Sequence, residues 1–130
     1  RLGGAVQASV LLQSFGFKHG MPLDSDFIFD MRCLPNPYWE AHLRQYTGLD
    51  QAVRDYLEQF PDVQRMLDSL EQFMDTWVPA FSSCNRSYVT VSIGCTGGRH
   101  RSVYMVEKLG KHLRETLGDS VKIRHRNVKS

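Results

Sequence analysis

The sequence predicts an α/β fold: a small, mostly parallel sheet of about four strands flanked by helices, with a phosphate-binding loop between a strand and a helix. Short apolar or alternating segments typical of strands occur four times along the chain. Segments with apolar residues at helical spacing separate them. A length of 130 residues, 42% of them hydrophobic, suits one domain, so we expect residues 1–130 to form a single domain.

The first half of the chain predicts two strands followed by two helices. Residues 8–15 form a short apolar run, and residues 26–32 alternate between apolar and polar side chains, both patterns typical of strands. Residues 50–60 carry apolar side chains at helical spacing, and Pro61 suits the first turn of the next helix. We interpret the long apolar stripe of that helix as core rather than as a cofactor site. Its members are Val63, Met66, Leu67, Leu70, Phe73, Met74, Trp77, Val78 and Phe81.

The second half predicts a strand, a helix and a last strand. Residues 87–94 are rich in β-branched side chains, which favour a strand. Residues 101–117 place apolar side chains on one helical face, and Gly118 is a suitable helix end. Residues 120–126 alternate, which indicates a strand with one buried face. Val121, Ile123 and His125 lie on one side of that strand, and Lys122, Arg124 and Arg126 lie on the other.

Charge is divided unevenly along a chain whose formal net charge is +2. Residues 1–84 hold 6 Lys and Arg against 11 Asp and Glu, giving −5, and residues 85–130 hold 10 against 3, giving +7. A basic half favours a polyanionic partner. A solvated basic surface that the acidic half balances in space explains the same counts, so composition leaves both interpretations open.

The three cysteines, Cys33, Cys84 and Cys95, stand at unrelated spacings. Without a Cys-x-x-Cys pair they predict neither a disulfide framework nor a metal site. Free thiols favour a reducing compartment, and we interpret Cys33 and Cys84 as partly buried small apolar residues. No apolar run approaches the roughly 20 residues that cross a bilayer, and no signal peptide is recognisable. We therefore expect a cytoplasmic protein without a membrane partner.

The candidate functional site follows the third predicted strand. Gly97 and Gly98 permit positive φ and a close approach of backbone N–H groups to a ligand. The start of the next helix adds free N–H donors and a positive dipole end. Arg99, His100 and Arg101 place cations where the dipole disfavours them, an arrangement that a bound anion offsets. The predicted phosphate-binding residues are Cys95, Thr96, Gly97, Gly98, Arg99, His100, Arg101 and Ser102.

The same segment also fits a different class of protein. Cys95, five residues, Arg101 and Ser102 form the Cys-x5-Arg-Ser signature of cysteine-dependent phosphatases. In that chemistry the thiolate attacks phosphorus, the loop and the arginine bind the phosphoryl oxygens, and an aspartic acid protonates the leaving group. The candidate acids are Asp24, Asp26 and Asp30. The motif alone therefore keeps a phosphatase as the alternative function.

A second polar cluster ends the second predicted strand. Asp30 and Arg32 are two residues apart and share a strand face. In a parallel sheet this strand end opens on the same edge as the glycine-rich loop, where ligands of α/β proteins bind. Asp30 is then placed to accept hydrogen bonds from sugar hydroxyls or an amine, with Arg32 adding positive charge. An internal Asp–Arg pair that fixes the loop is the equal alternative.

Five motifs occur in order along the chain. They are Ser14-Phe15-Gly16-Phe17-Lys18-His19-Gly20, Asp26-Phe27-Ile28-Phe29-Asp30-Met31-Arg32, Leu34-Pro35-Asn36-Pro37, Thr47-Gly48-Leu49-Asp50 and Ile93-Gly94-Cys95-Thr96-Gly97-Gly98-Arg99-His100-Arg101-Ser102-Val103. Together they resemble the C-terminal domain of the RapZ family of RNase adapter proteins, from about residue 8 to the tail at residues 124–126. The order and number of the motifs make the resemblance highly specific.

The resemblance implies a bacterial, cytoplasmic domain that is not an enzyme. Proteins that it resembles bind regulatory small RNA, present it to a ribonuclease and sense glucosamine-6-phosphate. It implies a phosphosugar pocket built from residues 95–102 with Asp30 and Arg32, and no further cofactor. Full-length relatives carry an N-terminal P-loop domain, which this sequence lacks. Many relatives have His where Tyr38 precedes Trp39, and a tyrosine there cannot be a cation.

A basic stripe near the C-terminus predicts the RNA surface. Its residues are Lys122, Arg124, Arg126 and Lys129. Alternation along a strand lets the cations follow phosphates while the intervening side chains stay in the core. Few aromatic residues lie among them, so we expect recognition of helical shape and backbone in folded RNA rather than base stacking. One stripe offers few contacts, so tight binding is expected of a homo-oligomer.

Overall fold

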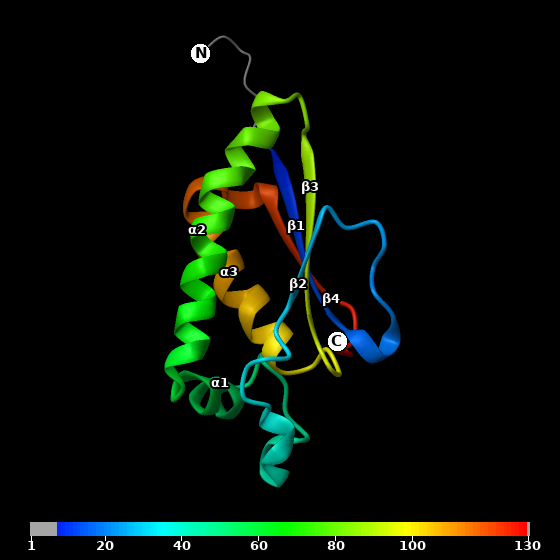
Figure 1. The fold of residues 1–130 in the computed structure, drawn as a ribbon, viewed down its shortest axis with the longest axis vertical. Coiled ribbons are helices and arrows are strands. Elements are labelled where there is room, and N and C mark those ends of the chain that lie inside the picture. The colour runs from blue at the N-terminus through cyan, green and yellow to red at the C-terminus, as the bar shows by residue number, and fades with distance from the viewer. Residues whose placement is uncertain (1–7, 130) are drawn as a thin grey trace.

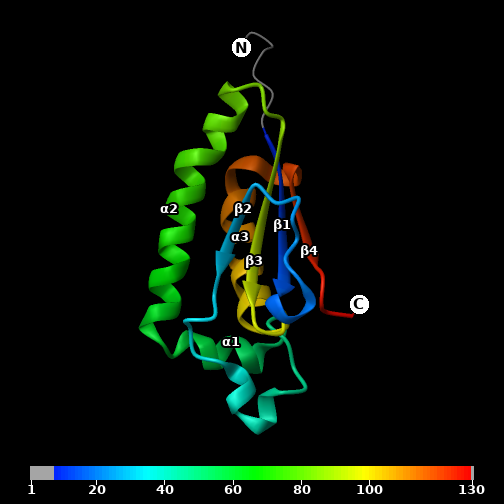
Figure 2. The ribbon, with the colours of Figure 1, turned by 45° about the vertical axis from the view of Figure 1, so that its right-hand side comes forward.

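The computed structural model describes residues 8–129, and it confirms the predicted fold class. Its strands are β1 (Ser9–Gly16), β2 (Phe27–Asp30), β3 (Tyr88–Cys95) and β4 (Val121–His125). Its helices are α1 (Gln51–Glu58), α2 (Pro61–Ser83) and α3 (Arg101–Leu117), with single turns of 3-10 helix in the connections. The four strands form one sheet in the order β2-β3-β1-β4, and all neighbours pair in parallel (Figure 2).

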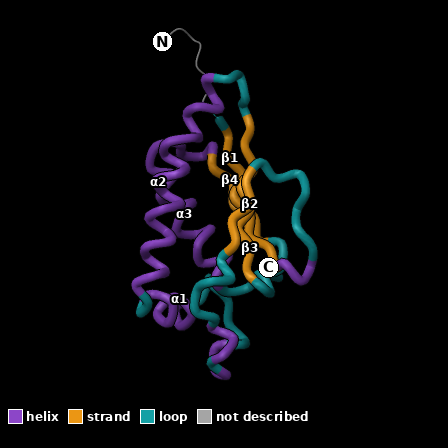
Figure 3. Tube along the Cα trace, viewed as in Figure 1, coloured by secondary structure: helices purple, strands orange, loops and turns teal. Residues whose placement is uncertain are grey.

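The helices lie on one side of the sheet (Figures 1 and 3). On the other side runs the connection between β1 and β2, which covers the middle strands. Ser25 of this connection shares a hydrogen bond with Ser92 of β3, and Ser92 accepts a second one from Gln13 Nε2 at 3.0 Å. The edge strand β4 therefore keeps part of its outer face open to solvent.

The core lies between the sheet and the helices. On β1 and β3 the residues facing the helices are fully buried, in agreement with the parallel register that pairs Val10 with Val89 and Leu12 with Val91. Helix α2 contributes the predicted stripe, including Leu67, Leu70, Met74 and Val78, each at most 5% exposed. β1 and β3 are neighbouring parallel strands, so the connections that follow them begin side by side at the carboxyl edge of the sheet.

Two predictions about burial are wrong. The sequence places Trp77 in the core stripe, two helical turns after the buried Leu70, yet Trp77 is 51% exposed. Cys33 and Cys84 were expected to be partly buried, and both are exposed. Cys33 lies in the turn after β2 and Cys84 caps the end of α2, and such turns run over the surface.

Candidate functional site: an anion-binding loop

The loop from Thr96 to His100 joins the end of β3 to the start of α3. Residues 96–100 therefore lie at the carboxyl edge of the sheet and at a helix N-terminus, as the sequence predicts. Lys18, which follows β1, donates its backbone N–H to the Thr96 carbonyl at 3.2 Å. The loop is thus tied to the neighbouring strand end and has a fixed shape.

The two loop glycines have different roles. Gly98 has φ +74°, and a Cβ there would lie 2.4 Å from the Gly16 nitrogen and 2.7 Å from Asn127 Oδ1. Gly97 does not use the positive φ that a glycine permits, and the atom nearest a Cβ on it would be Lys18 Cε at 3.9 Å. Gly98 is therefore required by backbone conformation and close packing, whereas Gly97 faces open space.

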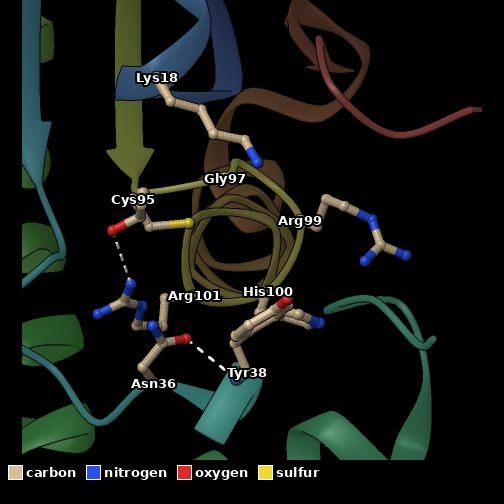
Figure 4. Close-up of a pocket in the computed structure, with 9 residues that line it drawn as sticks. Lys18, Asn36, Tyr38, Cys95, Gly97, Arg99, His100 and Arg101 are labelled. Carbon is tan, nitrogen blue, oxygen red and sulfur yellow. Dashed lines mark hydrogen bonds between the residues drawn. The ribbon is translucent and has the colours of Figure 1, made fainter. Parts of the chain in front are cut away.

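A cavity of about 340 Å³ opens in front of the loop (Figure 4). Its lining consists of Lys18, Asn36, Tyr38, Cys95, Thr96, Gly97, Arg99, His100 and Arg101. Six of the predicted phosphate-binding residues take part, while Gly98 and Ser102 support the loop from behind. Sequence reasoning missed Lys18 and Asn36 as lining residues, although both stand inside the motifs that carry the family resemblance.

Arg101 is the most unusual residue of the cavity, because this arginine is only 4% exposed. Nη1 donates to the carbonyls of Arg32 and Leu34 at 3.1 and 2.9 Å, and Nη2 donates to Thr96 Oγ1 at 3.4 Å. Nε finds no acceptor among residues 8–129. No carboxylate of the described chain forms an ion pair with Arg101. The buried cation therefore has no ion-pair partner among residues 8–129.

The neighbouring cations differ from the prediction of three positive charges at the helix start. Arg99 donates to the carbonyls of Arg44 and Gln45 at 2.8 and 3.4 Å, so its position is fixed by the connection before α1. His100 is buried and donates from Nε2 to the Tyr46 carbonyl at 2.7 Å. Burial lowers the pKa of His100, so it is a neutral tether at neutral pH rather than a cation.

Asp30 and Arg32 form the internal pair that was one of the two alternatives. Arg32 Nη2 lies 2.7 Å from Asp30 Oδ2, and the guanidinium stacks 3.9 Å from the ring centroid of Phe17. The hydrogen bond from Arg32 holds the pKa of Asp30 below its ordinary value. Neither residue lines the cavity. They act indirectly, since they fix the turn whose Arg32 carbonyl binds Arg101.

The phosphatase motif is only partly matched by geometry. Cys95 Sγ is buried and lies 3.2 Å from Ser102 Oγ, with the Ser102 N–H at 3.4 Å. No aspartate lines the cavity within the described chain. Asp26 accepts a hydrogen bond from the Thr90 N–H at the opposite end of β3, and Asp24 is exposed in the connection between β1 and β2.

The predicted basic stripe lies on the edge strand β4 and the turn after it. Lys122 and Arg124 are exposed, and Arg126 and Lys129 continue beyond the strand end. The inward residues alternate with them as predicted. His125, for example, lies 2.7 Å from Ser14 Oγ through Nδ1 and 2.7 Å from Glu107 Oε2 through Nε2.

A protein-family profile described as the RapZ C-terminal domain matches residues 8–129. The chain belongs to this family. The match covers every element of the fold and confirms the resemblance that the five motifs indicated. The family assignment therefore rests on the whole domain rather than on the glycine-rich segment at residues 95–102 alone.

Similar proteins from several bacteria carry the name nucleotide-binding protein. One from Thioalkalivibrio sulfidiphilus is 57% identical over 125 residues, which is 96% of this chain and 44% of that protein. One from Marinobacter nauticus is 56% identical over 119 residues (92% and 40%), and one from Pseudomonas putida is 55% identical over 118 residues (91% and 41%). The chain thus spans less than half the length of these relatives.

The described part of the RapZ-type domain has neither a clustered metal site nor a helix that could span a membrane. Among residues 8–129, no three His, Cys, Asp or Glu side chains gather in a group able to hold a metal ion. Within the same range, none of the helices combines the length and the apolar character needed to cross a bilayer.

Proposed function

We propose that this domain binds the phosphate group of a sugar phosphate, such as glucosamine-6-phosphate, in the loop at residues 95–101. The observation that carries the proposal is the buried Arg101 guanidinium, which has carbonyl acceptors but no carboxylate partner among residues 8–129. Burying an unpaired charge is costly, and removal of the partner of a buried pair costs several kcal/mol. A bound phosphate supplies the missing negative charge.

The surroundings of Arg101 fit a phosphate. Backbone N–H groups at the start of α3 and the helix dipole favour an anion at this point. Arginine binds phosphate oxygens through two parallel hydrogen bonds, and Nε is still free to donate. Lys18 approaches from the opposite wall of the cavity with a flexible ammonium group (Figure 4).

The rest of the cavity suits a small polar molecule. About 340 Å³ is within the range of small-ligand sites. Asn36 and Tyr38 offer an amide and a hydroxyl to sugar hydroxyl groups. The relatives named nucleotide-binding protein fit the same idea, because nucleotides also present a phosphate on a sugar.

We further propose that the domain is a cytoplasmic RNA adapter, which binds small regulatory RNA along β4 and presents it to a ribonuclease. Lys122, Arg124, Arg126 and Lys129 support this function because they form a row of exposed cations without an ion pair within the described chain. Such a row attracts a phosphate backbone with little regard to base sequence. A homo-oligomer would join several rows and increase the affinity.

A thermal unfolding titration tests the phosphate site. Glucosamine-6-phosphate at about 100 times its Kd should stabilise the domain by about 2.7 kcal/mol, and glucosamine alone should have a much smaller effect. Arg101→Ala should abolish the shift, whereas Arg65→Ala, which changes an exposed arginine on α2, should retain it. Arg101→Lys provides a second variant that keeps the charge but loses the two-pronged geometry. A shift of parental size in both Arg101 variants would place the ligand elsewhere.

A salt titration tests the RNA surface. The affinity for a structured RNA hairpin should fall with salt, and Lys122→Ala/Arg124→Ala should lower the salt slope by about two, one for each phosphate contact. Arg65→Ala is again the matched control. Equal affinity and slope for the double variant and the parent would place RNA on another surface.

A cysteine-dependent phosphatase is the second candidate, because Ser102 approaches Cys95 Sγ as that chemistry requires. A phosphatase is the weaker candidate because the cavity lacks a general acid among its described lining residues. General-acid catalysis needs a carboxyl group within hydrogen-bonding reach of the leaving oxygen. The cavity lining contains no carboxyl group from the described residues.

A further inference from the structure

The cations of this domain fall into two groups. Arg32, Arg65, Arg86 and Lys108 each pair with a carboxylate at 2.7 to 3.3 Å. A second group forms no ion pair with any described carboxylate: Lys18, Arg99, Arg101, Lys122, Arg124 and Arg126. These six cations line the cavity or stand on the basic stripe, and Arg44, Arg54, Lys111 and Arg114 elsewhere in the domain also form no ion pair with a described carboxylate. The positive charge of the cavity and the stripe is therefore available to an external anion.

The cavity and the stripe meet at the end of the sheet. The Arg126 N–H donates to the Ser14 carbonyl at 3.0 Å, and the Gly16 N–H donates to Asn127 Oδ1 at 2.7 Å. Asn127 also packs against Gly98 of the loop. The turn after β4 therefore contacts both the end of β1 and the phosphate-binding loop.

We propose that these two surfaces form one RNA site, in which the loop binds the terminal phosphomonoester of an RNA chain and the stripe binds the phosphodiesters that follow it. This inference rests on the proposed phosphate and RNA functions and adds the RNA end as the specific ligand. Lys18 lines the cavity beside Gly97 and adds a cation to the part of the site that binds the terminal phosphate.

The chemistry of an RNA end matches the cavity. A phosphomonoester presents three terminal oxygens and a charge of −1.5 to −2 near pH 7, with a second pKa of about 6. An internal phosphodiester carries a single charge and is flanked by two sugars, so it cannot enter a buried site as deeply. The terminal ribose phosphate is itself a phosphosugar, so a free sugar phosphate and an RNA end would compete for Arg101.

The geometry of β4 matches the part of the RNA chain that follows its terminal phosphate. Lys122 and Arg124 project from the same face, and alternate residues of a strand are about 6.6 Å apart. This repeat lets successive side chains meet successive phosphates of an extended strand. A single-stranded end that leaves a hairpin therefore fits along the stripe, and the hairpin itself lies beyond it.

Fluorescence anisotropy with one hairpin and its single-stranded tail tests the inference. The tail is supplied with a 5′-phosphate, a 3′-phosphate or hydroxyl groups only. One phosphorylated form should bind at least about ten-fold more tightly than the hydroxyl form, since charge-assisted hydrogen bonds contribute roughly 1.5–3 kcal/mol and 1.4 kcal/mol is ten-fold. Inorganic phosphate should remove this advantage without abolishing the binding of the hydroxyl form.

Two variants distinguish the contribution of the cavity from that of the basic stripe. Lys18→Ala changes an exposed residue, so it should fold, and it should reduce the advantage of the phosphorylated end. Lys122→Ala/Arg124→Ala should weaken all three RNAs by the same factor. Equal affinity of the parent for all three RNAs would overturn the inference, even with the glucosamine-6-phosphate shift intact. Absence of binding to every form would overturn it together with the proposed RNA function.

Discussion

Replacement of Gly98 by alanine is the most direct test of the loop architecture. Its φ of +74° is a left-handed conformation that costs an L-residue about 1–2 kcal/mol. The added Cβ would also lie 2.4 Å from the Gly16 nitrogen and 2.6 Å from the Phe15 carbonyl carbon. These are backbone atoms and cannot rotate away, so overpacking adds about 1–3 kcal/mol. We expect Gly98→Ala to destabilise the domain by about 2–5 kcal/mol.

Gly97→Ala is the matched control on the adjacent residue. No positive φ is required there, and the atom nearest the added Cβ would be Lys18 Cε at 3.9 Å. This substitution should leave the free energy of unfolding unchanged or raise it by about 0.4–1 kcal/mol, because alanine lowers the conformational entropy of the unfolded chain. Urea unfolding of both variants without ligand gives the difference directly. Equal stabilities for the two variants would refute the loop geometry, because sequence alone makes them equivalent.

Three further predictions concern other parts of the molecule. Aryl phosphate turnover by the parent should stay at background and be unaltered by Cys95→Ser, and turnover that this variant loses would establish the phosphatase instead. Trp77→Gln should change the free energy of unfolding by less than about 0.5 kcal/mol, whereas Met74→Ala should cost about 2–5 kcal/mol in the same urea titration. The hydrogen bond to Asp75 raises the pKa of His112, so its contribution is complete below about pH 6.5 and lost as the pH rises through the folded-state value. This loss amounts to at most about 1 kcal/mol in the free energy of unfolding between pH 6 and pH 9. His112→Gln should remove it, and a variant with the same pH dependence as the parent would contradict the assignment.

The fold and the position of the loop were predictable from sequence because both depend on local patterns. Periodicity of apolar residues predicted all four strands and the long helices, with ends displaced by only a few residues. Polar and small residues between a buried strand and a helix marked the carboxyl edge of the sheet. Alternation along residues 121–125 likewise predicted which side chains of the last strand face solvent.

The electrostatic state of the site was not predictable in this way. His100 and Arg101 are adjacent cations in sequence, yet burial and the Tyr46 carbonyl make His100 a neutral tether. The sequence left an internal pair and a ligand contact equally open for Asp30, and the structure shows the pair with Arg32. These outcomes depend on which carbonyls and carboxylates lie within hydrogen-bonding distance, and that is a property of the packed chain.

The sequence by itself therefore determined the α/β class, the family and the loop that carries Arg101. Only the tertiary structure decided that Lys18 and Asn36 share a cavity with that loop, that Gly98 rather than Gly97 is constrained, and that Arg101 is buried without an ion pair to any carboxylate of residues 8–129. The physical reason is that periodicity acts over neighbouring residues, whereas parallel pairing of β1, β3 and β4 joins segments that are tens of residues apart. Contacts between such segments are set by register and close packing of the whole sheet.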